Sequence, residues 1–164
     1  MKSPEELTEV FRSRGLKVTP QRQCIFRVLH GTGVHPTAES VFAAVRVEMP
    51  TVSLKTVYQT LNDLASMGEI QQLDLGTGST RFDPNVDAHH HLVCTRCGKV
   101  RDLYADFSHV KVPPRRRQGF VVSGAEVVFR GLCDECSHAT GASPAQTQTH
   151  PASSAIHHEE NLHA

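Results

Sequence analysis

Two pairs of cysteines are spaced to bind a single metal ion. Two residues separate Cys94 from Cys97, and two separate Cys133 from Cys136. Such a turn lets two thiolates reach one ion, and two turns complete the tetrahedral sulfur shell that Zn²⁺ takes in structural sites. We predict a structural zinc site that ties the C-terminal strand to the middle of its domain and leaves no position open for catalysis. Redox dithiols and unpaired buried thiols are the alternatives.

A second group of candidate ligands contains imidazoles and carboxylates. If the run His89–His91 is a strand, the first and last imidazoles point to the same side. Such a ligand set suits Fe²⁺ or Mn²⁺ better than a structural zinc ion, and solvated histidines are the alternative. The candidates for this regulatory site are His35, Asp83, His89, His91 and Asp102.

These candidate ligands are spread over two halves of the chain. His35 precedes a predicted helix in the first half, Asp83 ends that half, and His89, His91 and Asp102 follow a segment that resembles a hinge. A metal bound by all five would fix the angle between the halves, which provides a route from metal concentration to the arrangement of the chain.

The first half has the pattern of a winged helix-turn-helix. Helices are predicted over 4–14, from Thr19-Pro20 to His30, from Thr37 to Glu48 and over 54–67, each with a capping residue or an apolar stripe. Strands at 69–75 and 79–83 flank a Gly76-Thr77-Gly78 turn, which is typical of a hairpin. Cys24 is expected to be a core thiol on the second helix.

The second half is predicted to be smaller and rich in strands. Residues 84–88 are a hinge, and strands are expected at 91–94, 100–103, 120–122 and 126–129. The overall fold class is therefore α+β: a winged-helix domain over 1–84, then a small α/β domain for dimerisation and metal binding over 85–137. Residues 138–164 consist mostly of small and polar residues, and we predict that they are disordered.

Composition excludes some classes of function. The 164 residues carry 17 basic and 17 acidic side chains, but residues 11–62 hold seven basic residues against two acidic ones, which favours a DNA-facing module. Neither a signal peptide nor a membrane span is predicted. We therefore expect a cytoplasmic protein with no membrane partner and no small-molecule substrate.

The helix predicted over 54–67 has a polar stripe beside its apolar face. Lys55, Gln59 and Asn62 form this stripe, Thr56 flanks it and Tyr58 lies on its boundary. The second helix of a helix-turn-helix enters the major groove, so Lys55, Thr56, Tyr58 and Gln59 are candidate DNA contacts.

Several segments together resemble the ferric uptake regulator (Fur) family, in order, over about residues 5–137. They are residues 15–22 (GLKVTPQR), 35–39 (HPTAE), 56–61 (TVYQTL), 81–83 (RFD), the His89–His91 run with its cysteine pair, and 131–136 (GLCDEC). The Asp at position 83, where iron-sensing members more often have Glu, resembles the peroxide-sensing PerR branch.

The resemblance implies a metal-dependent repressor that binds a near-palindromic operator as a homodimer. It implies that His35, Asp83, His89, His91 and Asp102 bind Fe²⁺ or Mn²⁺, and that peroxide reacting at bound iron oxidises a histidine and releases the operator. Lys17, Arg22 and Tyr58 match positions that contact DNA in the family.

The sequence departs from the family pattern at two places. Pro113-Pro114 stands where many members have a helix, so that helix is expected to be short or to begin there. Ala125 stands where many members have a histidine of a further metal site, and we expect that site to be absent.

Three other functions remain open. The chain could regulate the supply of iron, zinc, manganese or nickel without sensing peroxide. Two histidines and one carboxylate also occur in non-haem iron oxygenases, but ligands that straddle a hinge leave no substrate pocket, so we expect no enzyme. The third alternative is a zinc-stabilised interaction module that does not bind DNA. The predicted wing and the polar face of the helix over 54–67 argue against it.

Overall fold

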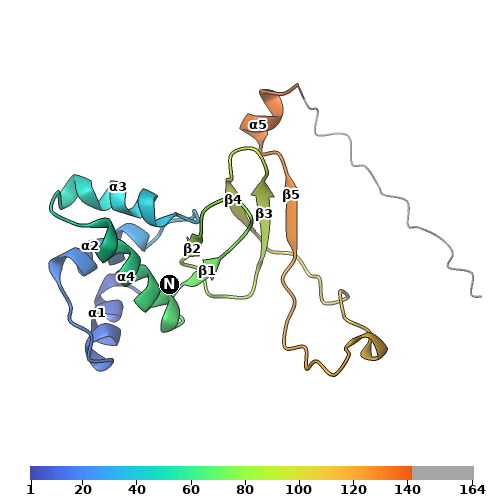
Figure 1. Ribbon diagram of the computed structural model, residues 1–164, viewed down its shortest axis with the longest axis horizontal. Helices are drawn as coiled ribbons and strands as arrows, with labels where there is room; N and C mark the ends of the chain where they lie inside the picture. The colour runs from blue at the N-terminus through green and yellow to red at the C-terminus, as the bar shows by residue number, and fades with distance from the viewer. Residues whose placement is uncertain (142–164) are drawn as a thin grey trace, which may run out of the picture.

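The computed structural model describes residues 1–141, which form a helical group and a small sheet joined by a hairpin (Figure 1). The helices are α1 (Pro4–Ser13), α2 (Pro20–Leu29), α3 (Ala38–Glu48) and α4 (Leu54–Ser66), followed by β1 (Gln71–Leu73) and β2 (Arg81–Asp83). The remaining elements are β3 (His90–Cys94), β4 (Val100–Leu103), the 3₁₀ turn η1 (Pro114–Arg116), β5 (Val128–Gly131) and α5 (Asp134–His138). The α+β class and the winged-helix order agree with the prediction.

The four N-terminal helices begin where their capping residues predict. The side chains of Ser3, Thr19, Thr37 and Ser53 each accept a hydrogen bond from a backbone amide in the first turn, which satisfies a donor that the helix leaves free. Helix α1 and helix α4 each end one residue earlier than predicted. These caps are local, so the sequence alone sets the helix starts.

The helical core is apolar and includes the predicted thiol of Cys24. Phe11 and Phe26 meet with ring centroids 4.9 Å apart, and Cys24 is fully buried beside them in the same cluster. Phe82 of β2 also belongs to this core. The wing is therefore attached to the helices by one buried aromatic ring.

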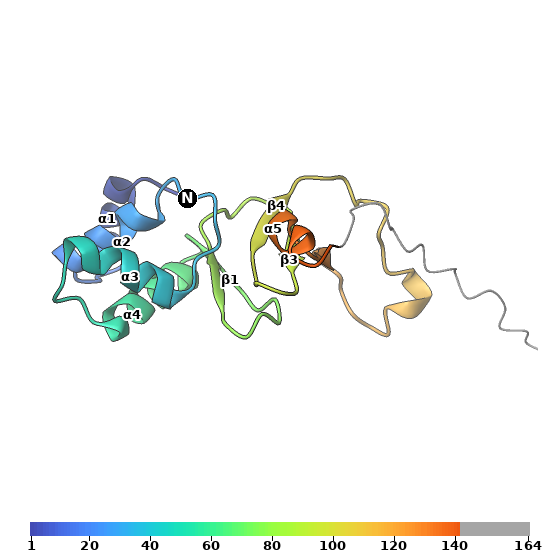
Figure 2. The same ribbon diagram turned by 90° about the horizontal axis from the view of Figure 1, so that it is seen from above.

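The wing also packs against the second half of the chain. Strands β1 and β2 pair antiparallel, and Gly76 and Gly78 in their turn have positive φ angles of 66° and 82°, which favour glycine. Leu73 and Leu75 form a second small core with Val93 and Val100. The hairpin thus lies between the helices and the sheet, as both views show (Figures 1 and 2).

The C-terminal sheet has the order β4-β3-β5, with β4 antiparallel and β5 parallel to β3. Between β4 and β5, a long segment containing η1 extends away from the sheet (Figure 2). The 3₁₀ turn at Pro114–Arg116 agrees with the short helix expected from Pro113-Pro114.

Several predicted boundaries in this half were wrong. Residues 120–122 form no strand, because Phe120 is 76% and Val121 95% exposed, and no strand within residues 1–141 pairs with them. The last strand runs from Val128 to Gly131 rather than over 126–129, since its register is set by pairing with β3. The strand predicted at 91–94 begins one residue earlier, at His90, and in the first half the strands predicted at 69–75 and 79–83 are shorter than expected.

Helix α5 was not predicted. It begins immediately after Cys133 and extends to His138, so the first residue assigned to a disordered tail is helical. The rest of that prediction, over 142–164, lies outside the described residues. No helix within residues 1–141 is long and apolar enough to cross a lipid bilayer.

Candidate metal centres

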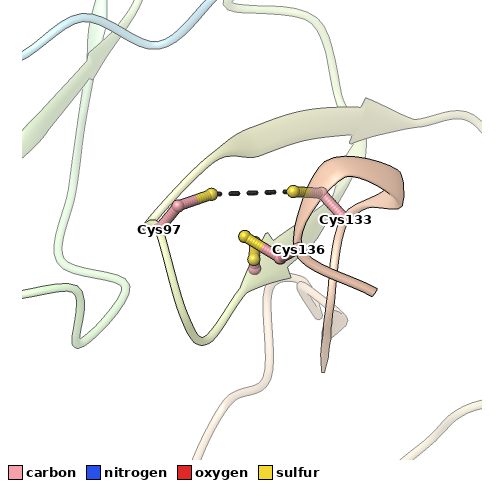
Figure 3. Close-up of side chains that lie close together, drawn as sticks. Cys97, Cys133 and Cys136 are labelled. Carbon is pink, nitrogen blue, oxygen red and sulfur yellow. Dashed lines mark hydrogen bonds between the residues drawn. The ribbon is translucent and has the colours of Figure 1, made fainter. Parts of the chain in front are cut away.

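The four cysteines meet where β3 ends and α5 begins. Cys94 is the last residue of β3, and Cys97 lies in the turn after it. Cys133 is the N-cap residue of α5, and Cys136 lies within that helix. Their sulfur atoms all lie within 4.8 Å of one another, and the Sγ atoms of Cys97 and Cys133 are 3.6 Å apart (Figure 3). A tetrahedral zinc ion with Zn–S bonds of about 2.3 Å sets neighbouring sulfurs about 3.8 Å apart. The cluster therefore fits Zn²⁺.

The protein environment favours thiolate at one corner of this cluster. Hydrogen bonds from backbone amides of Cys97 and Cys133 lower the pKa of Cys94 to about 6. The neighbouring carboxylate of Glu135 raises the pKa of Cys133 to about 12. A divalent cation would replace the protons at all four sulfurs, because thiolate is the form that ligates metal.

The five predicted regulatory ligands also converge, and they come from four segments. His35 lies in the loop before α3, and Asp83 is the last residue of β2. His89 immediately precedes β3, His91 lies within it, and Asp102 lies on β4. His91 and Asp102 are paired across the sheet. One ligand atom from each of the five lies within 4.8 Å of the others, so the structure brings the whole predicted set together.

The Nε2 atoms of the three imidazoles face the carboxylates. His35 Nε2 is 2.9 Å from Asp102 Oδ1, and His89 Nε2 is 2.9 Å from Asp83 Oδ2. His91 Nε2 lies 3.5 Å from the same Asp83 oxygen and 3.1 Å from His89 Nε2. Two aspartates and three imidazoles thus offer oxygen and nitrogen atoms to one point.

Several of these ligand atoms are buried without a hydrogen-bond partner. They are His35 Nε2, Asp83 Oδ2 and Asp102 Oδ1, and Asp83 and His91 are each only 1% exposed. Unpaired buried polar atoms are costly, and a cation bound among them would satisfy them. Burial opposes ionisation of Asp83, but the neighbouring His35 imidazole and the backbone amide of Asn85 hold its pKa below the ordinary value.

Four residues around this site were missed by the sequence analysis. Glu126 contacts His91, Asn85 and Tyr104 contact Asp102, and Arg81 donates to the backbone of His35. The Glu126 and Arg81 contacts join segments distant in sequence, so no local pattern marks these two residues. Tyr104 and Asn85 lie two residues from Asp102 and Asp83, and this proximity to predicted ligands is the signal that could have found them. Within residues 1–141, groups of three or more side chains that could hold a metal ion gather only at these two centres.

The predicted DNA-contacting residues lie on α4, on α2 and in the segment before α2. Lys17, Lys55 and Gln59 are exposed, and Thr56 is partly buried next to the capping Ser53. The Tyr58 hydroxyl is already engaged, since it donates a 2.6 Å hydrogen bond to Glu39.

Arg22 is also engaged within the protein. Its guanidinium lies 2.7 Å from Asp63 and stacks over the Phe11 ring. Its side chain is only 12% exposed, so in this conformation it braces α2 against α4 rather than projecting into solvent.

Comparison with known proteins shows the family to which the chain belongs. The model of the ferric uptake regulator family matches residues 13–129. A peroxide-responsive repressor, PerR, of Staphylococcus aureus (strain Mu50) is 33% identical over 133 residues, which cover 80% of this chain and 90% of the relative.

Solved structures of ferric uptake regulators are also similar to this chain. The ferric uptake regulator of Helicobacter pylori, described as having three functional metal-binding sites, has 25% identity and a TM-score of 0.66, covering 84% of this chain and 97% of its own. That of Pseudomonas aeruginosa, solved with manganese, has 28% identity and a TM-score of 0.57, covering 77% and 97%. The chain therefore belongs to the ferric uptake regulator family of metal-responsive transcription regulators.

Proposed function

We propose that this protein is a cytoplasmic, metal-dependent repressor that binds a near-palindromic operator as a homodimer. One observation carries the proposal: the regulatory ligands come from the loop before α3 and the end of the wing as well as from β3 and β4. A cation bound there joins the DNA-binding half to the sheet. Free thiolates for a four-cysteine zinc site also suit a reducing compartment.

Metal binding would act by selecting one arrangement of the two halves. All five ligands converge only when the wing lies against β3 and β4, so a cation binds that arrangement best. A 100-fold preference shifts the equilibrium by about 2.7 kcal/mol, which is enough to turn a mostly open population into a mostly closed one. Fe²⁺ or Mn²⁺ fits the mixed nitrogen and oxygen donors.

DNA recognition would use the exposed side of α4. Lys55, Tyr58 and Gln59 would lie near base edges or phosphates in the major groove, with Thr56 at the start of the helix. Lys17 and Arg22 would serve the DNA backbone. Arg22 would reach it only after leaving its ion pair with Asp63.

Dimerisation would use the apolar outer face of the sheet. Leu92 and Phe129 are register partners on β3 and β5, and each is more than 40% exposed in the single chain. Leu132, at the end of β5, is similarly exposed. An exposed apolar patch of this kind favours a protein partner, and a two-fold dimer accounts for a near-palindromic operator.

Peroxide sensing is the finer part of the proposal. Asp83 and the 33% identity to a peroxide-responsive repressor support it. Fe²⁺ held in the site would supply electrons that reduce hydrogen peroxide beside three imidazoles. Regulation of metal supply is the second candidate, because the related solved structures include a zinc-bound manganese uptake regulator, with 25% identity and a TM-score of 0.64.

The proposal is tested by metal-dependent DNA binding of the full chain. A duplex selected from a random library with Mn²⁺-loaded protein provides the probe. We expect tight binding with Mn²⁺, and weak binding for His89→Ala or after mild chelation that leaves zinc in place. Equal affinity with and without Mn²⁺ would overturn the regulatory role of this site.

A further inference from the structure

The three imidazoles of the regulatory site differ at the nitrogen that faces away from it. The Nδ1 atom of His89 lies 2.7 Å from the backbone carbonyl of Asp87, and the Nδ1 atom of His35 is buried without a hydrogen-bond partner. The Nδ1 atom of His91 lies 2.8 Å from the carboxylate oxygen Oε1 of Glu126. Only His91 among them has a charged acceptor at this position.

Glu126 is held in place although its side chain is 48% exposed. The residue after it, Val127, accepts a 3.1 Å hydrogen bond from the backbone amide of His91. Its own amide donates to His90 Nδ1 at 3.2 Å. Strand β5 begins at the next residue and pairs with β3. The backbone amide of His91, the imidazole of His90 and the pairing of β5 with β3 therefore fix where the carboxylate lies.

A carboxylate at Nδ1 determines what Nε2 can do. When Nδ1–H donates to Glu126, the imidazole is held in the tautomer whose Nε2 lone pair points into the site. Such a partner also fixes the ring orientation and makes the ligating nitrogen more basic. The bond is charge-assisted, and hence stronger than the bond from His89 to a neutral carbonyl.

We infer that Glu126 is a positioning residue for the regulatory metal, acting through His91. This inference rests on the proposed regulatory site. It makes His91 the best-oriented of the three imidazoles, and His35, whose Nδ1 has no partner, the least constrained. It also connects the two centres, because β5 leads directly from Glu126 and Val127 to Cys133 of the zinc cluster.

The inference is tested with Glu126→Ala and Glu126→Gln in the full-length, zinc-loaded protein. Mn²⁺ affinity is measured by the electron paramagnetic resonance signal of free Mn²⁺, and the ligand field by the visible spectrum of Co²⁺ in the same site. Glu9→Gln is the matched control, because Glu9 is an exposed, ion-paired carboxylate on α1. His91→Ala marks the loss of a direct ligand.

We expect Glu126→Ala to weaken Mn²⁺ binding by about 10–100-fold, as loss of a metal-site partner typically does. Glu126→Gln should fall between it and the parent, because its amide oxygen still accepts the hydrogen bond but lacks the charge. The Co²⁺ spectrum should change in both variants, whereas Glu9→Gln should match the parent. A purely structural role would leave the Co²⁺ spectrum unchanged.

The possible failures are distinguishable. If the parent binds Mn²⁺, His91→Ala abolishes that binding and both Glu126 variants match the parent in affinity and spectrum, the inference is overturned while the regulatory site stands. If the parent itself binds no Mn²⁺, the proposed function fails. Should Glu126→Ala not fold, Glu126→Gln decides alone: an affinity equal to the parent's overturns the inference, and a lower one supports it.

Discussion

The guanidinium of Arg81 donates a 2.6 Å hydrogen bond to the backbone carbonyl of Gly98, in the turn of the first cysteine pair. The same side chain donates at 3.0 Å to the carbonyl of His35. Arg81 belongs to β2, two residues before Asp83. One half-buried side chain therefore joins the wing, a regulatory ligand and the zinc cluster, and the two metal centres share a mechanical support.

The first prediction concerns Gly98 itself. Its φ angle is +71°, and a Cβ atom added there would lie 3.0 Å from the Arg81 guanidinium. Gly98→Ala should lower the free energy of unfolding by about 1–3 kcal/mol, because a left-handed backbone is strained for alanine. Urea denaturation measures this. Gly15→Ala is the control, since Gly15 also has a φ angle of +71° but no atom within 4 Å of its added Cβ; an equal cost at both positions would contradict the role of the Arg81 contact.

The second prediction concerns Arg81. Arg81→Met should destabilise the protein by about 1.5–3 kcal/mol, the usual worth of a hydrogen bond to a charged group. It should also weaken Mn²⁺ binding, because His35 loses its support. Equilibrium unfolding and Mn²⁺ titration check both effects. Arg81→Lys should recover part of each, and a variant that keeps full Mn²⁺ affinity would show that the support is dispensable.

The third prediction concerns the zinc cluster. Cys136→Ser should lose zinc and then unfold or fail to dimerise, since the four thiolates hold α5 and β5 against β3. Zinc analysis and sedimentation velocity measure the two outcomes. Cys24→Ser, at a buried thiol outside the cluster, should retain zinc even if it is less stable. A stable, zinc-free Cys136→Ser dimer would show that the site is not structural.

The fourth prediction concerns the exposed face of α4. Gln59→Ala should weaken operator binding by about 1–3 kcal/mol if the side chain contacts a base. Lys55→Ala should weaken binding to all sequences and reduce its salt dependence, as expected of a phosphate contact. Fluorescence anisotropy over a range of salt concentrations separates these effects. Parent-like binding by Gln59→Ala and Tyr58→Ala would place recognition on another face.

Tyr58 allows a finer comparison within this prediction. Its hydroxyl donates to Glu39, which raises the pKa of the tyrosine and lowers that of the glutamate. Tyr58→Phe removes the hydroxyl and keeps the ring. If the ring alone contacts DNA, Tyr58→Phe should bind like the parent, whereas Tyr58→Ala should not.

The fifth prediction concerns peroxide. Asp83→Glu should retain metal-dependent DNA binding but blunt the response to hydrogen peroxide. Mass spectrometry of the peroxide-treated, Fe²⁺-loaded parent should show one added oxygen on a peptide that contains His35, His89 or His91. The Mn²⁺-loaded protein should retain its operator and show no such addition. If the Fe²⁺ form also retains its operator through micromolar peroxide without oxidised histidine, regulation of metal supply becomes the better account.

The sequence by itself determined the features that depend on short-range chemistry. Ser3, Thr19, Thr37 and Ser53 set the helix starts because a capping side chain bonds to amides of its own first turn. The cysteine pairs predicted a four-sulfur cluster because two thiols in one tight turn face one point. The spacing of His89 and His91 predicted that both imidazoles lie on one side of a strand. His35, Asp83 and Asp102 were candidates from their positions in the predicted elements, and the resemblance to the family implied the same set.

Only the tertiary structure decided the contacts between distant segments. Residues 120–122 had strand-like composition, but strand formation needs a partner, and in the part of the chain that the structure describes no strand pairs with them. Arg22 and Tyr58 were candidate DNA contacts, yet in the structure Arg22 forms an ion pair with Asp63. The Tyr58 hydroxyl donates a hydrogen bond to Glu39. Glu126 reaches His91 because pairing of β5 with β3 sets its position. Such contacts depend on how the chain returns on itself, which no local pattern of residues encodes.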